Sequence, residues 1–215
     1  MKRTAEISAI AAALIAFIAS ALAYGHIPAE ARIAMHWNIH GEPDRFAGRL
    51  EALLLLPAMI LLLTLVLLAM SRSEMGRRTQ LENPAAWLAG WVGGFLVLVS
   101  AHLAILWNAI FQQDDVAGLP AVLAVVALVL IWIGNALPKT RPNPLVGVRT
   151  ASTLSDRGAW GASNRFAGWT FVLTGLATLG MLVGNQTELA IQVLVAGVMV
   201  SAVVSILIGR FTRPR

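Results

Sequence analysis

The sequence predicts an all-α, polytopic membrane protein with six transmembrane helices, one structured outer loop and one structured cytoplasmic loop. Of its 215 residues, 58% are hydrophobic and only 13% are charged, whereas a soluble domain carries about 25% charged residues. This composition excludes a soluble globular enzyme as the default. The chain has no cysteine, which excludes disulfides, thiolate metal ligands and a cysteine nucleophile.

Six apolar runs are long enough to cross a bilayer, which takes about 20 residues in a helix. They are 7–24, 50–70, 85–111, 119–137, 166–184 and 189–209. None has a charged residue in its middle, and backbone groups in lipid must pair internally, so each run is predicted to be a helix. The first run could instead belong to a cleavable signal peptide ending near Ala21-Leu22-Ala23. Its length favours a retained helix.

The distribution of basic residues predicts the orientation. One side carries most of them: Lys2, Arg3, Arg72, Arg77, Arg78, Lys139, Arg141, Arg149, Arg157, Arg165, Arg210, Arg213 and Arg215. The other side carries Arg32, Arg45 and Arg49. The positive-inside rule places the more basic side, with both termini, in the cytoplasm. The net charge of +5 therefore reflects membrane orientation and does not indicate direct nucleic-acid binding.

Small and polar residues inside the runs indicate how the helices pack. The last run has small residues at i, i+4 spacing, and such stripes let helix backbones approach closely. The stripe consists of Gly197, Ser201, Ser205 and Gly209. It could pack within the bundle or form a homodimer face. His102 and Asn108 lie in the third run. His102 could be functional, or a neutral side chain hydrogen-bonded to a neighbouring helix.

The loop 25–49 reads as a structured outer cap. His36-Trp37-Asn38 precedes Gly41-Glu42-Pro43-Asp44, a turn pattern in which glycine allows a positive φ and proline fixes its own. We expect the loop to fold back on the bundle and bury Trp37 and Phe46. We also expect His36 to form a hydrogen bond within the loop or near His102.

The loop 138–165 reads as a structured cytoplasmic segment. Asn143-Pro144 and Gly147 indicate a turn, and Ser155 is predicted to cap a short helix that runs through Trp160 to about Asn164. Gly147 is expected where a side chain would be disruptive. Arg149 is expected to make a fixed interaction, since its planar fork binds a carboxylate or several carbonyls. Membrane anchoring is the simpler role for Arg149, Arg157 and Arg165.

The two loops resemble the SdpI family of bacterial membrane proteins. The first resembles a small domain of unknown function that often precedes the family domain, with matches at Pro28, His36, Trp37, Asn38, Gly41, Pro43 and Asp44. The second resembles the family pattern N-x-x-x-G-x-R-T…T-L-S-D…W…N-R-x-A-G. The matches are Asn143, Gly147, Arg149, Thr150, Thr153, Leu154, Ser155, Asp156, Trp160, Asn164, Arg165, Ala167 and Gly168. We expect a two-helix unit at 1–84 and a four-helix unit at 85–215.

The resemblance implies a location, a role and partners. The namesake of the family is an immunity protein that protects a cell from its own secreted peptide toxin and holds a transcriptional repressor at the membrane. This implies a multi-pass protein of the bacterial plasma membrane that meets a peptide outside and a regulator inside. The implied binding residues are Asn143, Gly147, Arg149, Thr150, Trp160, Asn164 and Arg165 inside, and His36, Trp37, Asn38, Gly41 and Asp44 outside.

Two other classes of function stay open. A metal-dependent membrane enzyme could hold a divalent ion such as zinc with His36, His40, His26 and Asp44, because His36 and His40 have i, i+4 spacing. Against it, no H-E-x-x-H motif places a glutamate as base. A transporter or channel is disfavoured because the runs lack intramembrane charge and an evident repeat.

Overall fold

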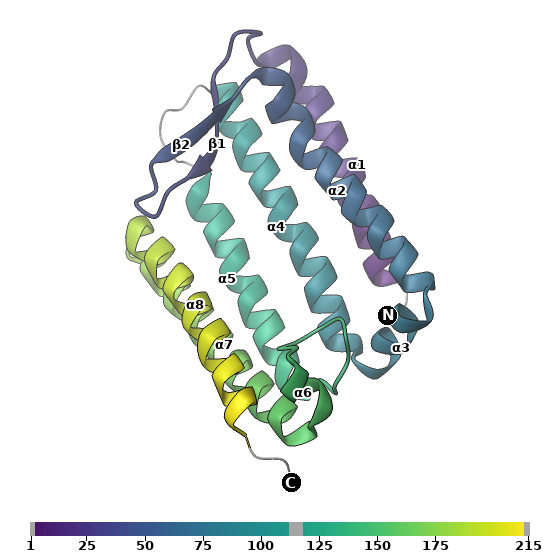
Figure 1. The fold of residues 1–215 in the computed structure, drawn as a ribbon. Coiled ribbons are helices and arrows are strands. Elements are labelled where there is room, and N and C mark those ends of the chain that lie inside the picture. The colour runs from purple at the N-terminus through teal and green to yellow at the C-terminus, as the bar shows by residue number, and fades with distance from the viewer. Residues whose placement is uncertain (1–2, 112–117, 213–215) are drawn as a thin grey trace.

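The computed structural model describes residues 3–111 and 118–212; Lys2, Arg213 and Arg215, used above for orientation, lie outside them. Within the described residues, six helices are long and apolar enough to cross a membrane, as predicted. They are α1 (Thr4–Ala23), α2 (Arg49–Arg72), α4 (Pro84–Phe111), α5 (Leu119–Ala136), α7 (Arg157–Val183) and α8 (Thr187–Phe211). They form one elongated bundle in which α1 begins, and α8 ends, at the same end (Figure 1).

Alanines bring α1 into close contact with α2 and α4. Ala5, Ala9 and Ala16 are completely buried on one face of α1, where small side chains let the helices approach. Ile60 of α2 and Phe95 of α4 fill the space against them. This cluster forms the core of the N-terminal part of the bundle.

Glycines bring α5 and α7 together. A Cβ on Gly134 would lie 2.6 Å from the carbonyl oxygen of Gly168, and a Cβ on Gly168 would lie 2.6 Å from the carbonyl oxygen of Gly134. The backbones of the two helices therefore touch at this point, which only glycine allows. Gly168 is one of the residues that match the family pattern, and its role here is packing.

The small-residue stripe of α8 packs against α7 within the chain. A Cβ on Gly197 would lie 2.1 Å from Thr174 Oγ1. Ser201 Oγ accepts a hydrogen bond of 2.7 Å from Thr170 Oγ1. Ser201, Ser205 and Gly209 are buried. The stripe thus serves the bundle itself, and the homodimer face stays a prediction.

The loop 25–49 forms a β-hairpin, which the sequence analysis did not predict. After the short 3₁₀ turn η1 (Tyr24–His26), β1 (Ile33–Trp37) pairs with antiparallel β2 (Pro43–Ala47). The hairpin covers one end of the bundle, here called the hairpin end (Figure 1). Ile33 packs into a cluster with Leu53 and Ile105. The expected cap is confirmed, but Phe46 is 41% exposed and Trp37 only partly buried, so the expected burial of Phe46 was wrong.

The opposite end, here called the loop end, carries shorter elements. These are α3 (Glu74–Glu82), the 3₁₀ turn η2 (Leu137–Lys139) and α6 (Ala151–Ser155). Ser73 caps α3 by accepting a hydrogen bond of 3.0 Å from the amide of Gly76. The segment 140–150 crosses this end between η2 and α6 and lies beside the first turns of α7 (Figure 1).

Candidate functional site

The loop end is held together by two buried asparagines. Asn143 Oδ1 accepts hydrogen bonds from the amides of Leu145 (3.0 Å) and Val146 (2.8 Å). Asn164, in the second turn of α7, accepts 2.9 Å from the amide of Val148 and donates 3.0 Å to the carbonyl of Trp160. Each amide side chain pairs backbone groups that would otherwise be left unsatisfied. The 140–150 segment is therefore a fixed structure.

Gly147 fits closely between Asn164 and Trp160. Its φ is +110°, in the region that favours glycine. A Cβ there would lie 2.6 Å from Asn164 Oδ1 and 3.0 Å from Trp160 Cζ2. The prediction that a side chain at position 147 would be disruptive is confirmed. Trp160 is itself buried and donates to the carbonyl of Thr140 at 3.0 Å.

The predicted start of the helix in this loop was wrong. Ser155 is the last residue of α6, which is capped by a reciprocal pair of hydrogen bonds between Thr150 and Thr153. The helix that contains Trp160 begins one residue later than expected. Asp156 caps it by accepting a hydrogen bond of 2.6 Å from the amide of Ala159, and the helix continues to Val183. Serine and aspartate are both good caps, so the sequence alone could not separate them.

Arginines face outward around this rigid segment. Arg149 Nη1 donates to the carbonyl of Pro144 at 2.6 Å, and the side chain is exposed. This is a fixed interaction, as expected, but with one carbonyl and with no carboxylate among the described residues. Arg157 and Arg165 are also exposed. One contact that the sequence did not predict joins the 140–150 segment to the N-terminal half. Asn83 Oδ1 accepts a hydrogen bond of 2.7 Å from the amide of Arg141.

A cavity of about 590 Å³, here called the loop-end cavity, lies beneath the 140–150 segment. It is lined by residues of α2, α4, α5, η2, α7 and α8 and by Leu145 to Thr150. Trp87 and Trp91 of α4, Phe171 of α7 and Ile206 of α8 give it a mainly apolar surface. No sequence pattern predicts this cavity, because it is formed by residues from distant parts of the chain.

The hairpin end carries a second group of predicted residues. His36 Nδ1 bonds Asp44 Oδ1 at 2.6 Å, which confirms the expected bond within the loop. Asn38 Oδ1 accepts from the amides of His40 (2.9 Å) and Glu42 (3.0 Å). Gly41 has a φ of +81°. Asn38 and Gly41 thus shape the turn, which begins at Asn38 and ends at Glu42.

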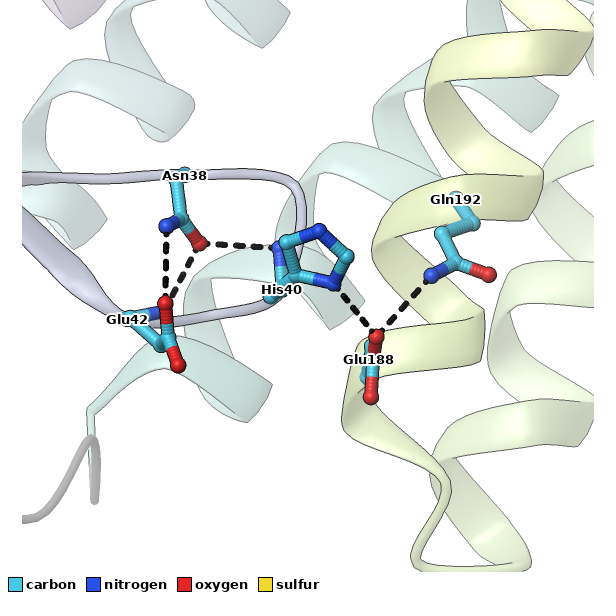
Figure 2. Close-up of polar contacts among 5 residues, drawn as sticks. All are labelled: Asn38, His40, Glu42, Glu188 and Gln192. Atoms are coloured by element: carbon cyan, nitrogen blue, oxygen red, sulfur yellow. Dashed lines mark hydrogen bonds and ion pairs between the residues drawn. The ribbon is translucent and has the colours of Figure 1, made fainter.

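The turn of the hairpin contacts α8. His40 Nδ1 donates to Glu188 Oε1 at 2.8 Å, and Gln192 Nε2 donates to the same oxygen at 3.1 Å. Figure 2 shows His40 reaching across to Glu188 in the first turn of α8. The Glu188 carboxylate raises the pKa of His40 above its ordinary value of 6.5. Sequence reasoning missed this contact, whose partners are 148 positions apart.

The proposed metal ligands are not brought together. Asp44 bonds His36, whereas His40 turns to Glu188, and His26 is exposed in η1. Within the residues that the structure describes, no group of three or more histidine, aspartate or glutamate side chains could hold a metal ion. The hairpin turn prevents the i, i+4 helical arrangement on which the metal interpretation depended.

The buried histidine at the hairpin end has a structural partner. His102 is completely buried and its Nε2 lies 2.9 Å from Ser20 Oγ. Ser20 Oγ donates its hydrogen to the carbonyl of Leu53 at 2.6 Å, so it accepts from His102. The expected bond to a neighbouring helix is confirmed, and it ties α4 to α1 and α2.

Fold and site together define a multi-pass helical membrane protein with a structured hairpin at one end and a rigid polar loop at the other. Residues 11–70 match a domain of unknown function, DUF1648, and residues 139–209 match the SdpI/YfhL protein family. The chain therefore carries a DUF1648 domain followed by an SdpI/YfhL family domain. The boundary expected between residues 84 and 85 stays a prediction.

A curated relative extends this similarity over most of the chain. It is the protein named "Immunity protein SdpI" of Bacillus subtilis (strain 168), which is 26% identical over 188 residues. The aligned region covers 84% of this chain and 84% of the relative. No solved structure matches the chain significantly.

Proposed function

We propose that this chain is an immunity-type receptor of the bacterial plasma membrane, with both termini in the cytoplasm. The hairpin end faces outward and senses or neutralises a secreted peptide. The loop end faces the cytoplasm and binds a regulatory protein. Three features support the proposal: the family match of residues 139–209, the name of the relative and the concentration of basic residues at the loop end.

The hairpin offers an apolar surface for a peptide. Ile39 in the turn is 47% exposed and Phe46 on β2 is 41% exposed, and the Arg32 guanidinium lies 4.6 Å from the centre of the Phe46 ring. These two exposed side chains offer apolar contacts that a peptide could use. Phe46 was expected to be buried, and its exposure instead supports peptide binding at the hairpin.

The observation that carries the proposal furthest is that α8 contacts both structured ends. At its start, Glu188 bonds His40 of the hairpin. At its end, a Cβ on Gly209 would lie 2.6 Å from both Ser163 Oγ and Thr153 Cγ2, next to the loop-end structure. A receptor must transmit a structural change from one side of the membrane to the other. In this protein α8 can transmit a displacement of the hairpin to the loop end.

The experiment uses the bacterium that encodes the chain. A strain lacking the gene is grown in medium conditioned by its parent, and survival is counted. We expect poor survival that the wild-type chain restores. A chain with Ile39→Ser and Phe46→Ser should restore less, whereas Val183→Ser, at an exposed position at the end of α7 outside the hairpin and the loop end, should restore fully. Equal survival of parent and deletion strain in every fraction of the medium would reject the immunity function.

A further inference from the structure

The loop-end cavity has no part in peptide sensing as proposed above, yet it has the features of a ligand site. Its volume of about 590 Å³ lies within the usual range of roughly 300–1,000 Å³ for ligand pockets. We propose that this cavity holds one acyl chain of an anionic phospholipid whose phosphate binds Arg149. The proposal does not depend on the receptor function.

The position of the cavity favours an acyl chain. The long helices that line it, α2, α4, α5, α7 and α8, all have the length and composition of membrane spans. The serine hydroxyls on the α8 wall are engaged: Ser201 Oγ accepts from Thr170 Oγ1, and Ser205 Oγ donates to the carbonyl of Ser201. The two serines of the α8 wall are therefore already hydrogen-bonded within the protein.

The charge at one end of the cavity favours an anionic headgroup. Arg149 is the only charged residue among the described residues that line the cavity. It donates one hydrogen bond, to the carbonyl of Pro144, and a guanidinium has five N–H donors. Further donors thus remain for a phosphate, which arginine binds bidentately. In the proposed orientation this end lies at the cytoplasmic leaflet, where anionic lipids are found.

Gly90 provides a way to fill the cavity without disturbing the fold. It lines the cavity, and a Cβ there would meet no atom within 4 Å. A leucine at this position would occupy the space of the acyl chain, and replacing a helical glycine favours the helix. Gly94 lies one turn further along α4 with the same open surroundings but outside the cavity. Gly94→Leu is therefore the matched control.

The test is quenching of tryptophan fluorescence in the purified protein by lipids with brominated acyl chains. Trp91 lines the cavity and is partly buried. We expect brominated phosphatidylglycerol to quench at a lower fraction of the lipid than brominated phosphatidylcholine. Gly90→Leu should weaken the phosphatidylglycerol effect by roughly tenfold, and Gly94→Leu should leave it unchanged. Trp91→Phe should reduce the preferential quenching, and what remains should come mainly from Trp87, which also lines the cavity.

Arg149→Gln tests the headgroup contact, because glutamine is polar but carries no charge. We expect it to lose the preference for phosphatidylglycerol by roughly tenfold, the loss expected for a hydrogen bond to a charged group. Arg157→Gln, an exposed loop-end arginine outside the cavity, should retain the preference. Equal quenching by the two lipids in the wild-type protein would overturn the proposal. Displacement of the brominated lipid by soluble glycerol phosphate would also overturn it. So would equal effects of Gly90→Leu and Gly94→Leu.

Discussion

Gly147 lies against Asn164 so closely that a Cβ on the glycine would be 2.6 Å from the Asn164 Oδ1 atom. The two residues are 17 positions apart, yet they determine the shape of the loop end together. Gly147 supplies a φ of +110°, and Asn164 then accepts the amide hydrogen of Val148. The rigidity of this segment follows from that pair, and it can be tested by substitution.

Gly147→Ala is expected to destabilise the protein by about 1–3 kcal/mol, because alanine would be strained at this φ and would clash with Asn164. Thermal unfolding in detergent measures the effect. Gly161→Ala in α7 is the control, since its Cβ would meet only the end of the flexible Arg165 side chain at 3.1 Å. It should be neutral or slightly stabilising. Equal unfolding temperatures for the two variants would contradict the close fit.

Asn164→Ala is expected to cost about 1–3 kcal/mol, because it leaves the partly buried amide of Val148 without its acceptor. Hydrogen exchange at the Val148 amide should become faster in this variant. Asn135→Ala is the control: Asn135 is exposed, and its side chain bonds only the carbonyl of Ile131 in its own helix. Unchanged exchange at Val148 would show that Asn164 does not hold the segment.

The contact between His40 and Glu188 is expected to weaken as pH rises. The Glu188 carboxylate raises the pKa of His40, and Glu42 adds a smaller effect in the same direction. A group whose pKa is raised by folding contributes stability that is complete below its ordinary value of 6.5 and is lost as pH passes its folded pKa. Hydrogen exchange in the hairpin should therefore be more protected, relative to the free-chain rate, at pH 6 than at pH 8.

Glu188→Gln removes the charge that favours protonated His40, so the pH dependence of hairpin protection should largely disappear. A titration of His40 by nuclear magnetic resonance measures the pKa directly. A His40 pKa at or below its ordinary value in the wild-type protein would refute the ion pair.

Arg149→Lys distinguishes recognition from simple charge. Lysine is equally effective as a positive-inside residue, but it lacks the planar fork. We expect the variant to insert normally and to lose at least half of the protection measured in conditioned medium. Arg157→Lys should retain full protection. Full protection by the Arg149→Lys variant would show that Arg149 contributes only its positive charge, as a membrane anchor does.

The sequence was sufficient for the spanning helices because a long apolar run has few alternatives in a membrane protein. It was insufficient for α3 and for the start of α7, whose residues are polar and whose helical structure depends on caps and on packing at the loop end. The hairpin was missed because its strands have five residues each, too short for a period to stand out.

The residues of the candidate site were likewise predicted only in part. Gly147 was identified in advance, since a glycine in a turn pattern has a local reason to be there. Asn83 and Thr140 were missed because each acts through a hydrogen bond, to Arg141 and to Trp160 respectively, that forms only in the folded bundle. The contact from His40 to Glu188 was missed for the same reason, as it joins the two family domains across the bundle.

The receptor account depends above all on the two structured ends facing opposite sides of the membrane. The chain has no cysteine, so single cysteines can be placed at Ile39 in the hairpin turn (47% exposed) and at Leu154 in α6 (46% exposed). A membrane-impermeant maleimide added to intact cells should label Ile39→Cys at once and Leu154→Cys only after the membrane is permeabilised. Labelling of both positions from the outside, or of Leu154→Cys alone, would contradict the account.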